Sequence, residues 1–298
     1  MLQAIVLGLV QGLTEFLPVS SSGHLTVVPY LLSWPKPPLA FDVALHFGTL
    51  LAVVAYFWGD LWYLATRSMG VGTEVDGEAA RARRTVGLLA VGSLPAAVIG
   101  FLFESTFERF FGDPRAVAGF LLGTAVILWG AEGIRRRRTA DLVGVRTRDL
   151  APEQRTIDPG RDEGTVGWLD TIAIGFAQAL AIFPGISRSG ATIAMGMARG
   201  LSREGSARYS FLLSVPIILG ATLAQAGELF TGQPEDRLFT GPEIAVGVTV
   251  AAVSGYWAIR FLLRYVVSDD LTGFARYVAF FAVLTFVGTL WIGPPSQI

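Results

Sequence analysis

Residues 8–24, Gly8-Leu-Val-Gln11-Gly-Leu-Thr-Glu15-Phe-Leu-Pro18-Val-Ser20-Ser21-Ser22-Gly23-His24, place a carboxylate, a carboxamide, hydroxyls and an imidazole inside an apolar N-terminal region. Gln11 and Glu15 are four residues apart, so on a helix they share one face. Pro18 lacks an N–H and ends that helix. The three serines after it are typical of the N-cap and first turn of a new helix. The stretch therefore predicts two short helices with polar side chains at the break between them.

The same pattern occurs again 167 residues later in the chain. Eight of the nineteen positions from 5 to 23 are identical at this fixed offset: Ile5, Gly8, Gln11, Leu13, Phe16, Ser20, Ser22 and Gly23 match Ile172, Gly175, Gln178, Leu180, Phe183, Ser187, Ser189 and Gly190. The second copy has Ile182, Arg188 and Ala191 where the first has Glu15, Ser21 and His24. We interpret the two copies as a duplicated scaffold whose halves have become chemically unlike.

The composition indicates an integral membrane protein. The chain has 298 residues, of which 52% are hydrophobic and 16% charged, and its mean hydropathy is +0.54. Soluble domains carry about 25% charged residues. The absence of cysteine excludes disulfides, thiolate catalysis and cysteine-ligated metals, and two histidines, His24 and His46, are too few for a histidine-rich metal site. No basic region precedes the first apolar run, so a cleaved signal peptide is not expected.

Six apolar runs are long enough to cross the membrane, which takes roughly 20 residues: about 40–64, 85–103, 115–134, 206–227, 241–263 and 273–292. Residues 2–32 and 168–200 each consist instead of two apolar arms with a break, and broken backbone is tolerated at membrane depth where it lines a protein cavity. We therefore expect an all-α integral membrane protein with six transmembrane helices and two re-entrant helical hairpins.

The order of these elements predicts an inverted-topology repeat. Three spans separate the two hairpins, and because three is odd, the hairpins enter the membrane from opposite faces. Transporters with such repeats have their site near the midplane. We expect a single membrane domain over 1–298, with a first repeat at 1–134 carrying the catalytic hairpin, a cytoplasmic polar loop at 135–166, and a second repeat at 167–298 carrying the arginine hairpin.

The basic residues predict the orientation. Of the 23 lysines and arginines, eighteen fall on the side of the 135–166 loop and four on the other, while Arg188 lies within the second hairpin. Basic residues accumulate on the cytoplasmic side. The mouth of the first hairpin is therefore expected to open to the outer side.

The two breaks together predict a phosphate site. The second helix of each hairpin starts at its break, and helix N-termini bind anions through unpaired N–H groups. Arg188 adds a positively charged guanidinium, which can bind a phosphate in a bidentate manner. The hydroxyl donors around it are Ser20, Ser21, Ser22, Ser187, Ser189 and Thr192. A phosphate or diphosphate is the ligand that uses this many donors.

Glu15 would repel such a ligand unless a cation lay between them. Mg²⁺ binds through one or two carboxylates together with phosphate oxygens, so Glu15 is the expected ligand of a divalent cation, Mg²⁺ or Ca²⁺. Gln11, one turn earlier, could add its carbonyl oxygen or hold a metal-bound water. His24 titrates near neutral pH and could serve Ser21 as a base, or protonate the leaving oxygen. The sequence leaves open whether Ser21, His24 or a water attacks phosphorus.

Structural alternatives exist for each of these residues. Glu15 could be a membrane glutamate neutralised by a neighbour, and Arg188 a salt bridge that locks the repeats together. Ser20 and Ser187 could simply cap their helices. For His46, in an apolar run with no motif, we expect a structural role, and Gln178 is expected to hydrogen-bond between helices. We expect the arginine run 135–138, in the polar loop, to anchor the chain on the cytoplasmic side.

Two motifs carry a family resemblance. The segment from Gln11 to His24 resembles the [E/Q]xxxE region of undecaprenyl-diphosphatases, the bacitracin-resistance family, and Pro184-Gly-Ile-Ser-Arg188-Ser-Gly-Ala-Thr192 resembles that family's PGxSRSxxT motif. The similarity extends along the chain and includes Phe41–Val54 and Ser206–Pro216. One departure is Gln11, where many members have Glu. The amide removes one negative charge, so Glu15 is expected to be the main metal ligand.

The resemblance implies hydrolysis of undecaprenyl diphosphate to undecaprenyl phosphate on the outer face of the bacterial inner membrane, with a divalent cation. It assigns Gln11, Glu15, Ser21 and His24 to the first motif, and Ser187, Arg188, Ser189 and Thr192 to the second. The expected partners are the polyprenyl diphosphate and membrane lipid, with no nucleic acid. The oligomeric state is open, with a homodimer among the alternatives. A transporter or flippase of a polyprenyl phosphate is the rival function, because inverted repeats are a transporter architecture.

Overall fold

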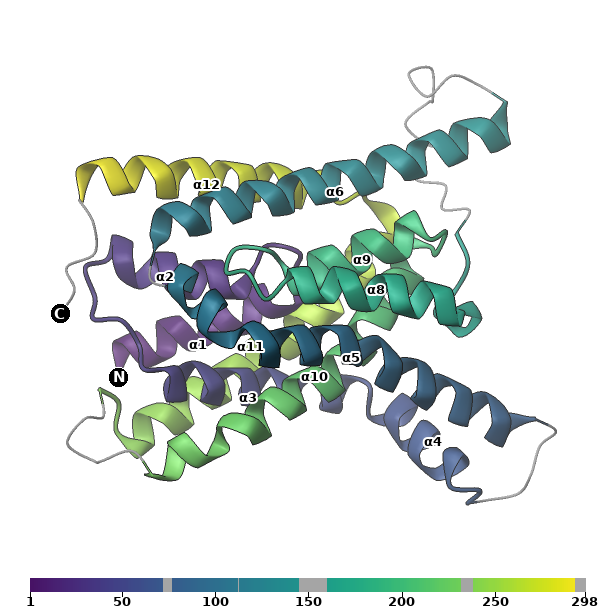
Figure 1. The fold of residues 1–298 in the computed structure, drawn as a ribbon, viewed down its shortest axis with the longest axis horizontal. Helices are drawn as coiled ribbons and strands as arrows, with labels where there is room; N and C mark the ends of the chain where they lie inside the picture. The colour runs from purple at the N-terminus through teal and green to yellow at the C-terminus, as the bar shows by residue number, and fades with distance from the viewer. Residues whose placement is uncertain (72–76, 112, 145–159, 232–237, 293–298) are drawn as a thin grey trace.

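The fold consists of helices packed side by side, with two helix pairs lying among the longer ones (Figure 1). The structure, a computed structural model, describes residues 1–71, 77–111, 113–144, 160–231 and 238–292. The α-helices in these ranges are α1 (Leu2–Phe16), α2 (Ser21–Leu31), α3 (Leu39–Tyr56), α4 (Trp58–Ser68), α5 (Glu78–Phe111), α6 (Pro114–Val143), α8 (Trp168–Leu180), α9 (Arg188–Ala198), α10 (Arg203–Thr231), α11 (Gly241–Ser268) and α12 (Thr272–Trp291), with one 3-10 turn, η2 (Glu163–Thr165). The part of the chain described here contains no β-strand, which confirms the all-α class.

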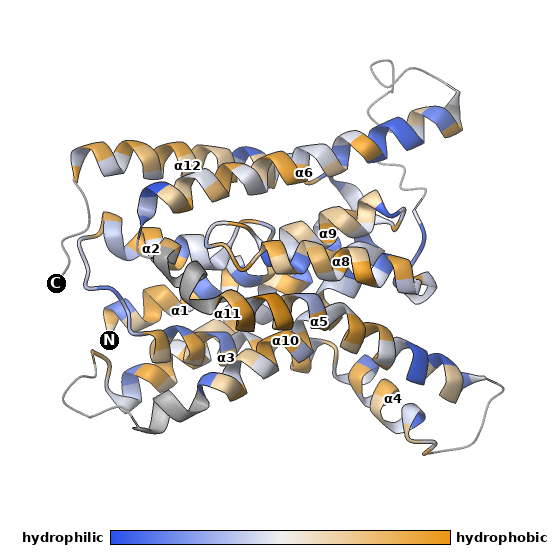
Figure 2. Ribbon diagram, in the orientation of Figure 1, coloured by the Kyte–Doolittle hydropathy of each residue, from blue (hydrophilic) through white to orange (hydrophobic). Residues whose placement is uncertain are grey.

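Within the described residues, six helices are long and apolar enough to cross a membrane, the number expected from the sequence. They are α3, α5, α6, α10, α11 and α12. Exposed apolar side chains such as Phe101, Val253 and Phe280 lie along them, and so much exposed apolar surface marks contact with lipid. Figure 2 shows these apolar residues along the bundle, while hydrophilic residues gather at the C-terminal end of α6 and the N-terminal end of α5. The chain is a multi-pass membrane protein.

The span predicted at 40–64 is shorter than expected. The helix α3 ends at Tyr56, Phe57 leaves helical geometry at ψ 22°, and α4 continues as a separate helix. No residue of α4 is buried, and Trp58 and Trp62 stack in exposed positions with their rings 6.0 Å apart. Hydropathy could not separate the two helices because the tryptophans and leucines of α4 extend the apolar run past its real end.

The arginine run 135–138 is helical, so the prediction that a polar loop begins at 135 was wrong. The helix α6 continues to Val143, and residues 145–159 of the predicted loop lie outside the described residues. Glu132 is the reason: it is buried, and it accepts two hydrogen bonds from Arg203, at 2.8 and 2.9 Å, and one from Arg135 at 3.1 Å. Arg136 pairs with Asp270 at 2.6 Å. Arg203 thus joins α10 to α6, and Arg136 joins α6 to the α11–α12 connection, beyond the anchoring role expected for the run.

Two helix pairs, α1–α2 and α8–α9, hold the repeated sequence. In Figure 1 the first pair opens toward the end of the molecule that carries the N-terminus, the second opens toward the other end, and their breaks meet in the middle. Two hydrogen bonds join the breaks: Ser189 Oγ donates to the Leu17 carbonyl (2.9 Å), and the Gly185 N–H donates to Ser22 Oγ (3.4 Å). That the pairs are re-entrant in a membrane and related by inverted topology stays a prediction.

The matched glycines Gly8 and Gly175 have the same role in the two copies. A Cβ at Gly8 would lie 2.6 Å from the carbonyl oxygen of Gly247 in α11, and a Cβ at Gly175 would lie 2.6 Å from that of Gly92 in α5. Both glycines therefore let the first helix of their pair touch the backbone of a long helix. Gln178 also contacts Gly92, donating to its carbonyl at 3.5 Å, which agrees with the interhelical role expected for it.

Candidate functional site

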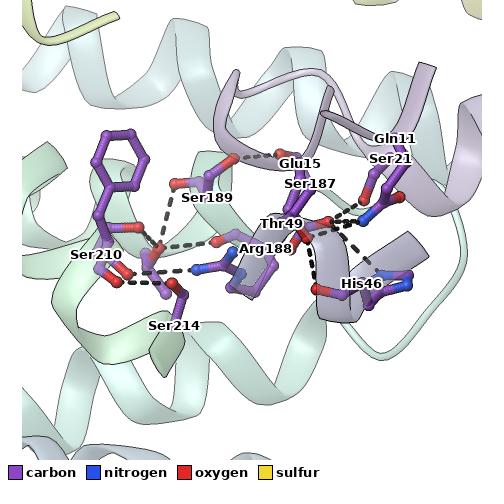
Figure 3. A network of polar contacts seen from close by, with 12 residues as sticks. Gln11, Glu15, Ser21, His46, Thr49, Ser187, Arg188, Ser189, Ser210 and Ser214 are labelled. Atoms are coloured by element: carbon purple, nitrogen blue, oxygen red, sulfur yellow. Dashed lines mark hydrogen bonds and ion pairs between the residues drawn. The ribbon is translucent and has the colours of Figure 1, made fainter. Parts of the chain in front are cut away.

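A single carboxylate, Glu15, holds the polar centre together (Figure 3). Its side chain is buried, and its two oxygens face different partners. Oε1 accepts a hydrogen bond from Arg188 at 2.8 Å. Oε2 accepts from Ser21 Oγ at 2.6 Å and from Gln11 Nε2 at 3.1 Å, and it lies 3.6 Å from Nε2 of His46. The acid of the first copy and the cation of the second thus meet directly, and the partners of Glu15 come from α1, α2, α3 and α9.

The first break positions Glu15 and Ser21. Glu15 lies in the last turn of α1, the chain turns through Pro18, and Ser20 caps α2 by accepting from the Gly23 N–H at 3.2 Å. Ser20 has φ 73°, a left-handed conformation that is strained for a residue with a side chain. Such strain costs on the order of 1–3 kcal/mol and clusters at functional sites. The turn allows Ser21, the first residue of α2, to point back at Glu15.

The second break positions Arg188, the first residue of α9. Ser187 caps that helix by accepting from the Gly190 N–H at 3.0 Å, as Ser20 does in the other copy. The loop is held by Thr124 of α6, which accepts from the Ser187 N–H (2.9 Å) and donates to the Gly185 carbonyl (2.8 Å). Thr124 is a site residue that the sequence did not indicate, because it is a lone threonine in an apolar span.

The remaining hydroxyls bind one another and the backbone. Ser22 Oγ lies 3.3 Å from Ser20 Oγ, and Ser189 Oγ lies 3.2 Å from Ser187 Oγ. Thr192 donates to the Arg188 carbonyl at 2.8 Å, and its oxygen lies 2.6 Å from that of Ser210 in α10. The matched serines Ser20 and Ser187 cap their helices through the hydrogen bonds from the Gly23 and Gly190 N–H groups. A phosphate-binding role for the six hydroxyl residues stays a prediction.

His24 does not join the Glu15 network. Its Nδ1 lies 2.7 Å from the Ser20 carbonyl oxygen, its Nε2 lies 2.8 Å from the Tyr277 hydroxyl, and its ring stacks on Phe281 at 4.1 Å. The Ser21 hydroxyl, for which His24 could have served as a base, donates instead to Glu15. The spacing of three residues put both side chains in one turn, but α12 draws the imidazole toward itself.

The imidazole beside Glu15 belongs to His46 instead. Nδ1 of His46 lies 2.8 Å from the Asp42 carbonyl oxygen one turn earlier, which fixes the ring with Nε2 toward Glu15. The sequence favoured a structural role for His46 because its neighbours are apolar and no motif surrounds it. Only the packing of α3 against α1 brings it to the site.

A cation site can be tested against these atoms. No group of three or more histidine, cysteine, aspartate or glutamate side chains converges within the described residues. Gln11, however, is fully buried, and its Oε1 has no hydrogen-bond partner while its Nε2 donates to Glu15. An orphaned carbonyl oxygen beside a carboxylate suits a hard cation, which binds oxygen ligands and completes its shell with water or phosphate. Glu15 and Gln11 therefore fit the divalent cation expected from the sequence.

Comparison with known proteins points to one family. The family model described as bacitracin resistance protein BacA matches residues 4–284. An undecaprenyl-diphosphatase of Moorella thermoacetica is 42% identical over 291 residues, which cover 98% of each chain. One of Rubrobacter xylanophilus is 40% identical over 285 residues, or 93% of this chain and 94% of the relative. The undecaprenyl-diphosphatase 2 of Stutzerimonas stutzeri is 38% identical with the same coverage. The family match spans both helix pairs and five of the six long helices, and it ends within α12.

Proposed function

Because the chain belongs to the bacitracin resistance protein family, we propose that it hydrolyses undecaprenyl diphosphate to undecaprenyl phosphate and inorganic phosphate. The observation that carries the proposal is the contact between Glu15, Ser21 and Arg188 where the two breaks meet. Phosphoryl transfer needs a positioned nucleophile and neutralised charge, and these three side chains supply both. The hydrolysis would return the lipid carrier to cell-wall synthesis and counter bacitracin.

The reacting groups follow from these contacts. In the proposal, the diphosphate binds at the N-termini of α2 and α9, with Arg188 on its oxygens. Ser21 Oγ, oriented by its hydrogen bond to Glu15, attacks the terminal phosphorus, its proton passes to an oxygen of the transferred phosphoryl group, and the bond from phosphorus to the bridging oxygen breaks to release undecaprenyl phosphate. Water then hydrolyses the phosphoserine, which releases inorganic phosphate and restores the Ser21 hydroxyl. His24 would support this step indirectly by holding the first turn of α2 against α12.

The divalent cation, Mg²⁺ or Ca²⁺, would be held by Glu15 and Gln11. When bound, it would neutralise phosphate oxygens that the Glu15 carboxylate would otherwise repel. Ser20, Ser22, Ser187, Ser189 and Thr192 would complete the phosphate pocket. Some of their present hydrogen bonds join one break to the other, so the substrate would have to displace them.

Phosphate release by purified protein tests the function. In detergent, with undecaprenyl diphosphate and Mg²⁺, inorganic phosphate should appear, and excess EDTA should abolish its release until Mg²⁺ or Ca²⁺ is restored. A flippase of a polyprenyl phosphate would release no phosphate, since transport leaves the anhydride bond intact. Absence of phosphate release from folded protein supplied with metal and substrate would refute the hydrolase.

Trapping the intermediate tests Ser21. With substrate labelled in its terminal phosphate, acid quenching should recover label on the protein as phosphoserine, and peptide mapping should place it at Ser21. The Ser21→Ala variant should give no labelled protein, whereas the control Ser22→Ala, which alters the neighbouring hydroxyl, should still be labelled. Wild-type turnover with no trapped label, together with an active Ser21→Ala, would assign the attack to water or to His24.

The proposal places the protein in the bacterial inner membrane as two inverted repeats, each with a re-entrant pair, and with the mouth of α1–α2 outside. The chain has no cysteine, so single cysteines report on sidedness. Exposed positions Lys36 and Asp113 should react with an impermeant maleimide on intact spheroplasts, and exposed Asp141 and Asp269 only after the membrane is opened. Outside labelling of Asp141 would reverse the orientation. Labelling of Lys36 and Asp113 from opposite faces would contradict the span count.

A further inference from the structure

His46, whose side chain is 34% exposed beside Glu15, has no part in the proposed reaction. Its Nδ1 lies 2.8 Å from the backbone carbonyl of Asp42. A carbonyl oxygen can only accept a hydrogen bond, so Nδ1 carries the proton. In the neutral ring, Nε2 then carries a lone pair, and this lone pair faces Glu15 Oε2 at 3.6 Å. A lone pair beside a carboxylate oxygen is unfavourable unless a positive charge lies between them.

Two further features show that, among the described residues, no positive charge neutralises Glu15 at Oε2. Arg188 neutralises the carboxylate at its other oxygen, Oε1, so it does not serve the Oε2 side. Gln11, which donates to Oε2 through Nε2, leaves its own Oε1 buried without a partner. Nε2 of His46 thus lies on the Oε2 side of Glu15, and the buried amide of Gln11, bound to Oε2 through Nε2, leaves an oxygen without a partner in the same region.

We infer that Nε2 of His46 is a nitrogen ligand of the divalent cation, alongside Glu15 Oε2 and Gln11 Oε1. The inference rests on the proposed function, because it completes the cation site of that reaction. First-row metals lie about 2.1 Å from nitrogen and oxygen ligands, so two donor atoms 3.6 Å apart can share one ion. The Asp42 carbonyl orients the ring from behind, as second-shell acceptors do for metal-bound histidines.

A nitrogen ligand changes which metals the site prefers. Imidazole suits transition metals, whereas Ca²⁺ and Mg²⁺ favour oxygen ligands. The site should therefore bind Mn²⁺ more tightly than an all-oxygen site would. His46→Gln replaces the imidazole with an amide and should weaken Mn²⁺ binding at least about tenfold, the lower end of the loss seen even for outer-shell partners. Ca²⁺ binding should change much less.

Mn²⁺ bound to the full-length protein in detergent is the probe. Pulsed electron paramagnetic resonance should detect an imidazole nitrogen coupled to the metal, and the coupling should change to that of ¹⁵N when histidine alone is ¹⁵N-labelled. The chain has two histidines, so two variants assign the nitrogen. His46→Gln should lose the coupling, while His24→Gln should keep it. The labelled wild type already answers whether a histidine binds, without any substitution.

The outcomes separate this inference from the function it rests on. Mn²⁺ that binds the wild type, is lost in Glu15→Ala and shows no histidine coupling would overturn the inference and leave the hydrolase intact. Coupling that persists in His46→Gln would overturn it too. If no Mn²⁺ binds and phosphate is released in excess EDTA, both the inference and the cation of the proposed reaction fail. Histidine-coupled Mn²⁺ without phosphate release would support the inference and refute the hydrolase.

Discussion

Replacing Glu15 with alanine should lower kcat/KM for undecaprenyl diphosphate by on the order of 10³-fold or more, because one carboxylate serves three functions. It receives the Ser21 hydroxyl at 2.6 Å, it fixes Arg188 at 2.8 Å, and it is the only carboxylate in the proposed cation site. Gln11→Ala should lose less, since Glu15 would still hold the metal, and Gln11→Glu should stay active. Phosphate release across metal concentrations, measured on purified variants, checks all three.

Glu132 offers a matched control for that experiment. Like Glu15 it is a buried glutamate paired with arginine, but its two partners, Arg203 and Arg135, lie away from the candidate site, where α6 meets α10. Removing one partner of a buried pair costs roughly 3–5 kcal/mol. Glu132→Ala should therefore lower the melting temperature while the folded protein keeps near-normal turnover. If Glu15→Ala shows that same pattern, Glu15 is structural.

The sequence predicted the parts of this protein that depend on neighbouring residues. The break at Pro18, the caps at Ser20 and Ser187 and the six apolar spans all follow from local chemistry, and the structure has them. The 167-residue offset also indicated which residues of the two copies correspond. It could not say that Glu15 and Arg188 would touch, but it gave the reason to look, since each is what the other copy lacks.

The contacts that the sequence did not indicate all join distant segments of the chain. His24 is bound by Tyr277, which lies 253 residues away, and no pattern around His24 indicates that partner. His46 lies at the site because α3 packs beside α1, although its own surroundings in sequence are apolar. Arg136 is held in a helix by Asp270, a residue after α11. Polar residues within a span or at its end thus gain their roles from whichever helix lies opposite.

Arg188→Ala should reduce kcat/KM on the order of 10³-fold, comparable to losing an arginine finger in other phosphoryl-transfer enzymes. The matched position in the first copy is Ser21, so the scaffold itself does not require a cation there. In the structure the guanidinium uses one nitrogen for Glu15 and another for the Ser210 carbonyl at 3.3 Å. It is bound to one oxygen of Glu15 while the proposed nucleophile is bound to the other, so both lie beside the carboxylate where a transferring phosphoryl group would carry its charge.

Arg188→Lys separates charge from geometry. Lysine keeps the positive charge but loses the planar fork. It can pair with Glu15 or reach a phosphate oxygen, but it cannot hold both from fixed positions, so turnover should still fall at least about tenfold. Melting temperatures provide the control, with Arg203→Lys as the matched variant, because Arg203 also binds a buried glutamate, in its case through two nitrogens. Arg203→Lys should lower stability and spare turnover, and Arg188→Lys should do the reverse. A stability loss with normal turnover in Arg188→Lys would make Arg188 only a link between the two helix pairs.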